Sequence, residues 1–243
     1  MEQAILDKLE EKLAAHETVA VATVLRGPIA GQVLLDATGR ILAGGFESEQ
    51  LTAAVAVSSK SYLADLRSGR EEIRIDDQTS DLFFEVYPPP PQIIVIGAVH
   101  VAIHLIAFGK RLGYRTVVID PRTAFATVER FAEADELLIE WPTEALAKLV
   151  ITDNTYFAML THDLKIDLPA IEIALRSPAR YIGTLGSKKT HSKRVAALRE
   201  GRFSEPDIAR IHNPIGLDLG GRRAEEIALA IIAEIVAVRH GRP

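Results

Sequence analysis

Residues 93–102 read Ile-Ile-Val-Ile-Gly-Ala-Val-His-Val-Ala. The apolar run before Gly97 predicts a buried strand, and the segment after it, 101–112, has the apolar period of a helix. Asp120 follows the next predicted strand, 116–119, and stands 23 residues after the glycine. A strand, a glycine turn, a helix and an acid about 20 residues later are typical of a dinucleotide-binding βαβ unit.

The C-terminal part of the chain continues this alternation of strands and helices. It predicts a parallel sheet that is covered by helices on both faces, an α/β, Rossmann-like fold. Further strands are expected at 137–139, 156–160 and 180–182, and helices at 143–149, 168–175, 188–199, 204–211 and 225–239. The last helix is apolar almost all round, so we expect it to be buried in the core or in the interface of a homodimer.

Four consecutive prolines, 88–91, precede this Rossmann-like domain, 92–243. Proline fixes φ and lacks an N–H donor, so the run predicts a stiff linker between two domains. Residues 1–87 have the pattern of a small α+β domain. Helices are expected over 2–15 and 48–66, and strands over 19–25, 32–35, 40–42, 72–75 and 82–87.

Composition and charge exclude several classes of protein. The chain has no cysteine, which excludes disulfides, thiolate nucleophiles and cysteine-ligated metals. Its net charge of −5 argues against a nucleic-acid partner. The acidic N-terminus and the lack of a long apolar run predict a cytoplasmic protein without a membrane partner.

The charge is unevenly distributed. Residues 1–87 carry 8 basic and 15 acidic side chains, whereas residues 88–243 carry 20 basic and 18 acidic ones. Within the second part, residues 180–202 carry seven basic side chains and one acidic side chain. The basic segment favours an anionic ligand, and the acidic first domain could provide a docking face for a partner protein.

A polar loop follows the strand predicted at 156–160. Ligands of open α/β sheets bind outside the carboxyl ends of the strands. Thr161, His162 and Asp163 are therefore candidate ligand contacts. Asp167 is equally well explained as the N-cap of the helix that is expected to begin at Leu168.

A second loop joins a strand to the basic helix. The backbone N–H groups of Gly183, Gly186 and Ser187, together with Lys188, would converge on an anion such as a phosphate. The spacing is not that of a Walker A motif. Basic residues further along the helix are expected on its solvated face: Lys193, Arg194 and Arg199.

Two observations bear on alternative ligands. Val99 occupies the position of the middle glycine of the dinucleotide fingerprint, where its branched side chain would obstruct the pyrophosphate. An NAD(P)-dependent oxidoreductase with His162 as acid–base stays open as an alternative. His100 and His104 lie four residues apart, but no third ligand accompanies them, so no metal site is assigned. His100, at the start of the helix, is a candidate ligand contact.

These motifs together resemble the XdhC/CoxI family, the accessory proteins of xanthine dehydrogenase and other molybdenum hydroxylases. The resemblance covers nearly all of 92–242. It rests on five segments in order: 97–102, 120–122, 161–167, 181–187, and 212–220 with 225–228. The first domain is similar in layout only, because Gly44-Gly45-Phe46 stands where the family usually has Gly-Gly-Cys.

The resemblance implies a chaperone that binds the molybdenum cofactor, supports its maturation and inserts it into an apo-hydroxylase similar to xanthine or CO dehydrogenase. This cofactor is an anionic pterin with a phosphate and a dithiolene-bound metal. The resemblance and the motifs together give its expected contacts: Gly97, His100, Asp120, Arg122, Thr161, His162, Asp163, Gly183, Gly186, Ser187, Lys188 and Asp218. No catalytic residue is assigned. A diverged scaffold that binds only a partner protein is a further alternative.

Overall fold

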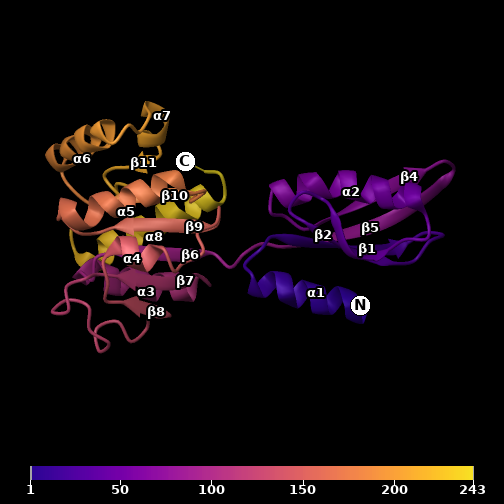
Figure 1. Ribbon diagram of the computed structural model, residues 1–243, viewed down its shortest axis with the longest axis horizontal. Coiled ribbons are helices and arrows are strands. Elements are labelled where there is room, and N and C mark those ends of the chain that lie inside the picture. Colours follow the sequence, from indigo (N-terminus) through magenta and orange to yellow (C-terminus); the bar gives the residue numbers. More distant parts are fainter. Residues whose placement is uncertain (1, 243) are drawn as a thin grey trace. The chain divides into compact units, whose positions relative to one another are not determined.

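The computed structural model describes residues 2–242, and the chain divides into two compact units between Pro89 and Pro90 (Figure 1). The division falls inside the run of four prolines. Each unit has its own sheet and its own hydrophobic core. Among residues 2–242, no helix combines the length and apolarity needed to cross a bilayer.

Unit 1 is a five-stranded antiparallel sheet with one helix on each face. The strand order is β3-β2-β1-β5-β4. The elements are α1 (Gln3–Ala14), β1 (Val19–Arg26), β2 (Gln32–Asp36), β3 (Ile41–Gly45), α2 (Glu49–Ala64), β4 (Gly69–Ile75) and β5 (Gln78–Tyr87). Alternate residues of β1 serve the two faces: Ala20 packs with the α2 core, and Val19 packs with Ile5 and Leu9 of α1.

Unit 2 is a six-stranded parallel sheet, and the predicted α/β class is confirmed. The strand order, β11-β10-β9-β6-β7-β8, is the doubly wound order in which the first strand lies beside the fourth. The strands are β6 (Gln92–Ile96), β7 (Arg115–Ile119), β8 (Glu136–Leu138), β9 (Thr155–Met159), β10 (Tyr181–Thr184) and β11 (Ile211–His212). The helices are α3 (His100–Arg111), α4 (Pro142–Leu146), α5 (Leu164–Arg176), α6 (Lys188–Glu200), α7 (Glu205–Ile208) and α8 (Ala224–Arg239).

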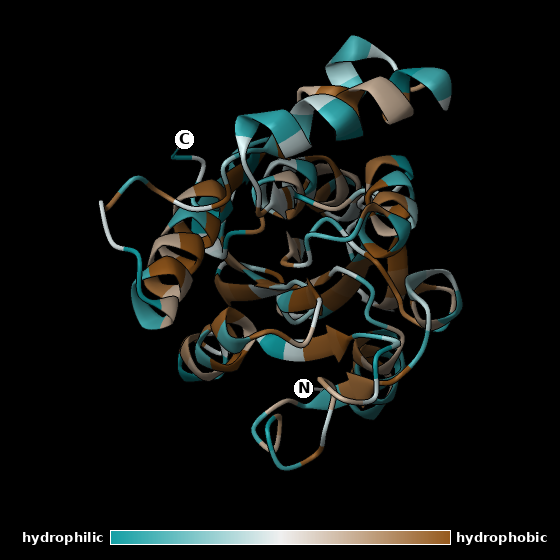
Figure 2. Cartoon of the chain, turned by 90° about the vertical axis from the view of Figure 1, so that its left-hand side faces the viewer, coloured by the Kyte–Doolittle hydropathy of each residue, from teal (hydrophilic) through white to brown (hydrophobic). Residues whose placement is uncertain are grey.

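The central strands are apolar throughout because helices cover both of their faces. In β6, Ile93 and Val95 pack with α3 and α8, and Ile94 and Ile96 pack with α5. Figure 2 shows these apolar strands at the centre, with the hydrophilic sides of the helices turned outward. The last helix, α8, buries one face against α3, while Leu229 is 49% exposed.

Two elements differ from the sequence-based prediction. Helix α5 begins at Leu164 rather than 168, because Asp163 caps it and Pro169 lies inside it rather than in its first turn. The helix expected over 204–211 is only one turn long, α7, and Ile211, the last residue of that range, begins the edge strand β11 beside β10. Asp167 is therefore not an N-cap.

We predict that Gly97→Ala destabilises unit 2 more than Gly113→Ala does. Both glycines have positive φ, but an added Cβ at Gly97 would lie 2.6 Å from Thr161 Cγ2, whereas the space around Gly113 is open. The steric overlap is expected to cost ~1–3 kcal/mol beyond the backbone strain that both variants share. Urea unfolding followed by the fluorescence of Trp141, the single tryptophan, reports on unit 2.

The additional change Thr161→Ser removes Cγ2 and should recover part of the loss in Gly97→Ala. Equal destabilisation by the two alanine variants would refute the close approach as the reason for Gly97.

Candidate functional site

The carboxyl ends of β6 and β9 mark the point where the strand order reverses. The chain leaves β6 for α3 on one face of the sheet and leaves β9 for α5 on the other. Ligands of open α/β sheets bind in the crevice that such a reversal creates. Here the crevice is an open cleft of about 610 Å³, which we call the switch-point cleft. It is lined by Val99, Arg122, Thr161, His162, Asp163, Leu164 and Lys165.

Gly97 lets the loops after β6 and β9 approach closely at this cleft. Its φ of +112° favours glycine, and Thr161 leaves no room for a Cβ. The turn leads to Val99, the N-cap of α3, which makes no side-chain capping bond. In the first turn of α3, Ala102 N donates to Val99 O (3.1 Å), whereas the N–H groups of His100 and Val101 have no acceptor among residues 2–242. His100 is exposed beside them but does not line the cleft.

Asp120 is fully buried and positions its neighbours rather than facing a ligand. Its carboxylate accepts four hydrogen bonds, from Ala98 N (2.8 Å) and from Arg122 N (2.9 Å), Nε (2.9 Å) and Nη2 (2.7 Å). Burial alone would raise the pKa of Asp120, but these hydrogen bonds outweigh burial and hold the pKa below its ordinary value. The Asp120 carboxylate is thus already hydrogen-bonded within the protein. To bind a ribose or a pterin, it would have to give up some of these four hydrogen bonds.

Arg122 is held by Asp120 at the side of the cleft. Its guanidinium also lies over the ring of Phe125, 4.5 Å from the centroid. Among residues 2–242, no hydrogen-bond acceptor engages its third nitrogen, Nη1. The side chain is 35% exposed, so this donor is fixed in place and accessible.

The loop after β9 supplies the most accessible polar side chains of the cleft. His162 and Lys165 are exposed. Asp163 accepts a hydrogen bond from Lys165 N (2.9 Å) and is the N-cap of α5. The buried Thr161 contributes mainly to the wall, because its hydroxyl bonds to Asp167.

Arg194 and Asp167 form a fully buried ion pair behind this wall. The expectation of a solvated Arg194 is therefore wrong. Its guanidinium also donates to the main-chain oxygens of Leu185 (3.0 Å) and Thr161 (3.4 Å), which ties together the loops after β9 and β10. Burial raises the pKa of Asp167, and the hydrogen bonds from Thr161 and Arg194 oppose this effect without cancelling it.

The residues predicted to form an anion loop lie outside the switch-point cleft. Gly183 is buried in β10, and a Cβ there would lie within 2.6 Å of Ile215 side-chain atoms, so this glycine serves packing. Gly186 has a φ of +150°, and a Cβ there would lie 3.0 Å from the buried Arg194. Ser187 is the N-cap of α6 and accepts from Thr190 N (3.3 Å), and Lys188 is exposed.

Asp218 belongs to a second hollow, of about 330 Å³, between the loop 214–221 and the start of α8. It is exposed and accepts a hydrogen bond from Gly220 N (3.2 Å). Leu185 also lines this hollow, so Arg194 contacts one wall of each hollow. Of the twelve predicted contacts, the switch-point cleft brings together four, Arg122, Thr161, His162 and Asp163, with Gly97 setting their spacing.

A network that the sequence did not reveal holds the loop 212–217. Glu234 of α8 accepts from Tyr181 Oη and Gly216 N (2.7 Å), and it bonds to His212 Nδ1 (3.0 Å). Burial alone would raise the pKa of Glu234, but the hydrogen bonds from His212, Tyr181 and Gly216 outweigh burial and lower it. The sequence does contain one indication of this network, because Glu234 is an acidic residue that stands among the isoleucines of an otherwise apolar helix.

The two histidines of α3 do not assemble a metal site. The rings of His100 and His104 have their centroids 5.5 Å apart. Within the described range, 2–242, no group of three or more His, Cys, Asp or Glu side chains is arranged to hold a metal ion.

Comparison with known proteins supports this description of the fold. Residues 93–235 match the family model described as the XdhC Rossmann domain. A relative from Bacillus subtilis, described as a probable subunit of xanthine dehydrogenase, is 29% identical over 163 residues, which cover 67% of this chain and 47% of the relative. The molybdenum cofactor insertion chaperone PaoD of Escherichia coli is 35% identical over 95 residues, which cover 39% of this chain and 30% of the relative.

A solved structure shares the fold of both units. It is described as a xanthine dehydrogenase from Bacillus halodurans, and it matches with a TM-score of 0.71 and 22% identity. The match covers 97% of this chain and 66% of that chain. The aligned regions span about half or less of the length of the curated relatives.

We predict that Arg194→Met destabilises unit 2 by ~3–5 kcal/mol, because the change leaves the buried Asp167 carboxylate without its ion-pair partner. The double variant Arg194→Met with Asp167→Leu removes both charges and is expected to recover most of that loss. Urea unfolding of both variants measures the difference. A double variant as unstable as the single one would show that the ion pair itself is not responsible.

The lowered pKa of Asp120 predicts a pH-dependent contribution to stability. A carboxylate with a folded pKa below its unfolded value stabilises the fold above the unfolded value, and this contribution is lost as pH falls through the folded value. Asp120→Asn should cost ~2 kcal/mol at pH 7, and the difference from the parent should shrink below about pH 4. Asp218→Asn, at an exposed carboxylate with one hydrogen bond, is the control and should leave the free energy of unfolding nearly unchanged. A difference for Asp120→Asn that is constant with pH would contradict this role.

Proposed function

The chain belongs to the family of XdhC Rossmann domains, and on that premise we propose that it is an accessory protein that binds the molybdenum cofactor and delivers it to an apo molybdenum hydroxylase. The names of its relatives support this role: one is called a molybdenum cofactor insertion chaperone, and another is named as a probable part of xanthine dehydrogenase. The recipient is accordingly an enzyme similar to xanthine or CO dehydrogenase.

The switch-point cleft is the observation that carries the proposal. Its volume of about 610 Å³ lies within the range of small-molecule sites. Val99, the residue before α3, lines it, and Arg122, His162 and Lys165 supply side-chain donors. The cofactor is an anion with a phosphate and a hydrogen-bonding pterin. These donors suit the phosphate of such a ligand, and the Asp163 carboxylate, which also lines the cleft, can accept from the N–H groups of a pterin.

Different residues of the cleft suit the phosphate, the pterin edge and the planar ring of the cofactor. The long, exposed side chain of Lys165 and the exposed His162 suit the phosphate, which needs charge more than exact placement. Arg122 is fixed by Asp120 and suits a group with defined acceptor directions, such as the pterin edge. Val99 and Leu164 supply apolar surface for the planar ring.

The openness of the site suits a protein that must release its cargo. The donors lie on the outer wall of a cleft at the end of the sheet, and none of them is enclosed by a lid in the described chain. Binding by hydrogen bonds and charge alone is reversible and needs no covalent step. A recipient enzyme with more contacts to the cofactor could therefore remove it from this cleft.

We predict that Lys165→Glu weakens retention of the molybdenum cofactor by about tenfold or more, which corresponds to ~1.4 kcal/mol. The change replaces an attractive charge at the cleft with a repulsive one. The measurement is an anaerobic titration of the full chain with isolated cofactor, with bound pterin and molybdenum both quantified. Lys60→Glu, an equal charge change on the exposed side of α2 in unit 1, is the matched control and should retain the cofactor.

Two further arms make the titration decisive. The double variant Lys188→Glu with Lys189→Glu measures whether the start of α6 contributes to phosphate binding. NADH serves as the parallel ligand, and binding of NADH without the cofactor would replace the chaperone proposal by the dinucleotide alternative. Equal retention of the cofactor by Lys165→Glu and Lys60→Glu would show that the cofactor does not bind in the switch-point cleft.

A further inference from the structure

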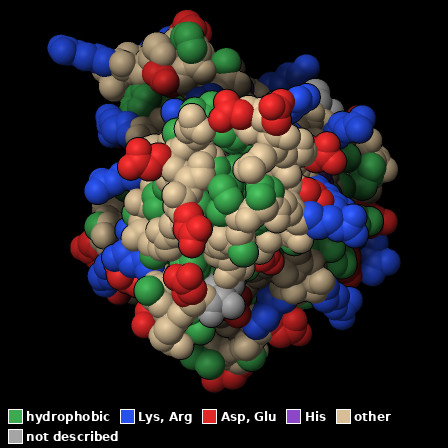
Figure 3. Space-filling model, turned by 90° about the vertical axis from the view of Figure 1, so that its right-hand side faces the viewer, with side chains coloured by type: hydrophobic (Ala, Val, Ile, Leu, Met, Phe, Trp, Pro, Cys, Tyr) green, Lys and Arg blue, Asp and Glu red, His purple; other side chains and the backbone are tan. Residues whose placement is uncertain are grey.

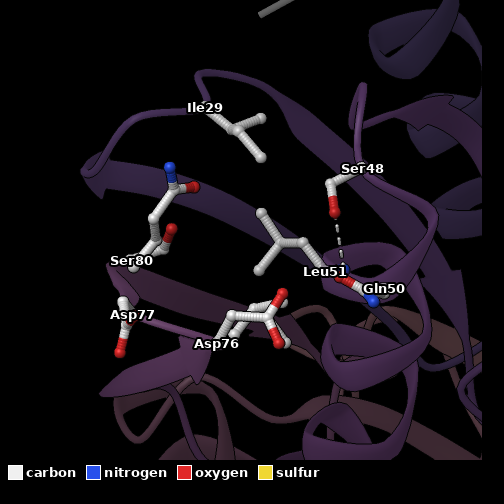
Figure 4. Close-up of a pocket in the computed structure, with 9 residues that line it drawn as sticks. Ile29, Ser48, Gln50, Leu51, Asp76, Asp77 and Ser80 are labelled. Carbon is white, nitrogen blue, oxygen red and sulfur yellow. Dashed lines mark hydrogen bonds between the residues drawn. The ribbon is translucent and has the colours of Figure 1, made fainter.

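Unit 1 contains a separate cavity of about 300 Å³ (Figure 4). It lies where the start of α2, the connection between β1 and β2, and the turn between β4 and β5 meet. Its lining residues are Ile29, Ser48, Gln50, Leu51, Ile75, Asp76, Asp77, Gln78 and Ser80. All nine belong to unit 1, and none of them takes part in the cofactor site proposed above.

The cavity exists because the core of unit 1 stops before the sheet does. Alternate residues of β5 face α2, and the inward row runs from Val86 through Phe84 and Leu82 to Ser80. The last of these is polar, and α2 begins beside it only at Glu49. The open end of the core therefore has an apolar floor, formed by Ile29, Leu51 and Ile75, with a hydroxyl beside it.

The Ser80 hydroxyl is the first indication of a ligand. The residue is only 4% exposed, and no group within residues 2–242 is hydrogen-bonded to its Oγ, which is not among the fully enclosed unpaired atoms and so faces the cavity. A hydroxyl in this position takes its hydrogen-bond partner from solvent or from a bound ligand. Figure 4 shows Ser80 beside the opening that Ile29 and Leu51 also border. A polar ligand atom at this point would complete the hydrogen bonding.

Asp76 supplies a charge at the same cavity. It lies in the two-residue turn between β4 and β5 and has a φ of +52°. Its carboxylate has no hydrogen-bond or ion-pair partner in the described part of the chain, and Figure 4 shows it directed toward α2. Its neighbour Asp77 points away from the cavity and lies 3.7 Å from Arg74.

The lining favours a cation, because none of its nine residues is Lys or Arg, whereas Asp76 and Asp77 are acidic. Arg74 lies next to the lining, donates to the main-chain oxygen of Asp76 (3.2 Å) and pairs with Asp77, but does not pair with the Asp76 carboxylate. The chain up to residue 87 carries 15 acidic and 8 basic side chains, and Figure 3 shows acidic and apolar side chains over the middle of the view, with basic ones mainly toward its edge. Such a field attracts basic partners and steers their approach.

We propose that this cavity binds the guanidinium group of an arginine side chain from a partner protein. The guanidinium has five N–H donors in a planar fork, so it can donate to the Asp76 carboxylate and the Ser80 hydroxyl at once, which a compact ammonium does less well. The aliphatic stem of arginine packs on Leu51 and Ile29. A volume of about 300 Å³ suits one anchoring side chain, the way in which buried arginines act at protein interfaces.

The test is an NMR titration of the isotopically labelled full chain with the blocked peptide acetyl-Gly-Arg-Gly-amide. We expect saturable shifts of the backbone amides of Leu51 and Ser80, with a millimolar dissociation constant that suits a single anchor. The lysine analogue should bind at least about threefold more weakly, and the uncharged norleucine analogue should produce no saturable shift.

Three variants locate the binding. Asp76→Asn removes the charge but keeps a residue that tolerates positive φ, and it should weaken the arginine peptide by about fivefold. Asp77→Asn, the same change one residue further along, is the matched control and should stay within about twofold of the parent. Ser80→Ala should also weaken binding, and the spectrum of each free variant checks that the fold is kept.

Four outcomes would overturn the proposal. They are an absence of saturable shifts at up to about 20 mM peptide, equal effects of Asp76→Asn and Asp77→Asn, equal binding of the norleucine peptide, and unchanged binding by Ser80→Ala. None of them depends on cofactor binding, so this result and the outcome of the cofactor titration are independent.

Discussion

The buried contact between Arg194 and Asp167 fixes the carboxyl edge of the parallel sheet. A guanidinium that is fully removed from solvent needs partners within the protein. Here Nη1 and Nη2 donate to the acid of α5 and to main-chain oxygens after β9 and β10, while Nε has no partner among residues 2–242. The pair therefore determines where two loops stand relative to each other. The shape of the switch-point cleft therefore depends on this ion pair.

Buried and exposed charges have different tasks in unit 2. The buried carboxylates of Asp120 and Asp167 and the partly buried one of Glu234 each hold a loop through several hydrogen bonds. The exposed side chains of His162 and Lys165 make no such commitments and stay available. Arg122 lies between these groups, since two of its nitrogens are bound by Asp120 and one is free. The carboxylates thus fix the loops, while the exposed side chains next to them stay free to bind a ligand.

Much of the fold, but less of the site, was predictable from sequence. The apolar run at 93–96 and the glycine turn identify the doubly wound sheet because periodicity is a local property. The prediction of a solvated Arg194 is wrong because its partner Asp167 is identified only once the loops are packed. The sequence likewise does not show that Asp120 pairs with Arg122, and its predicted contact with the cofactor stays a prediction. Arg194 shares its helix with exposed lysines, and only burial distinguishes it from them. The sequence predicts an anion contact at Gly183, and the structure adds that its lack of a side chain makes room for Ile215.

The parallel sheet of unit 2 ends on both sides in very short strands, β8 with three residues and β11 with two. An edge strand presents unpaired N–H and C=O groups that can pair with another chain, and short edges present few of them. Unit 2 therefore offers little template for strand-to-strand aggregation. The edges of unit 2 are thus poorly suited to strand pairing between copies, whereas the sheet of unit 1 ends in the longer strands β3 and β4, which present more unpaired backbone groups.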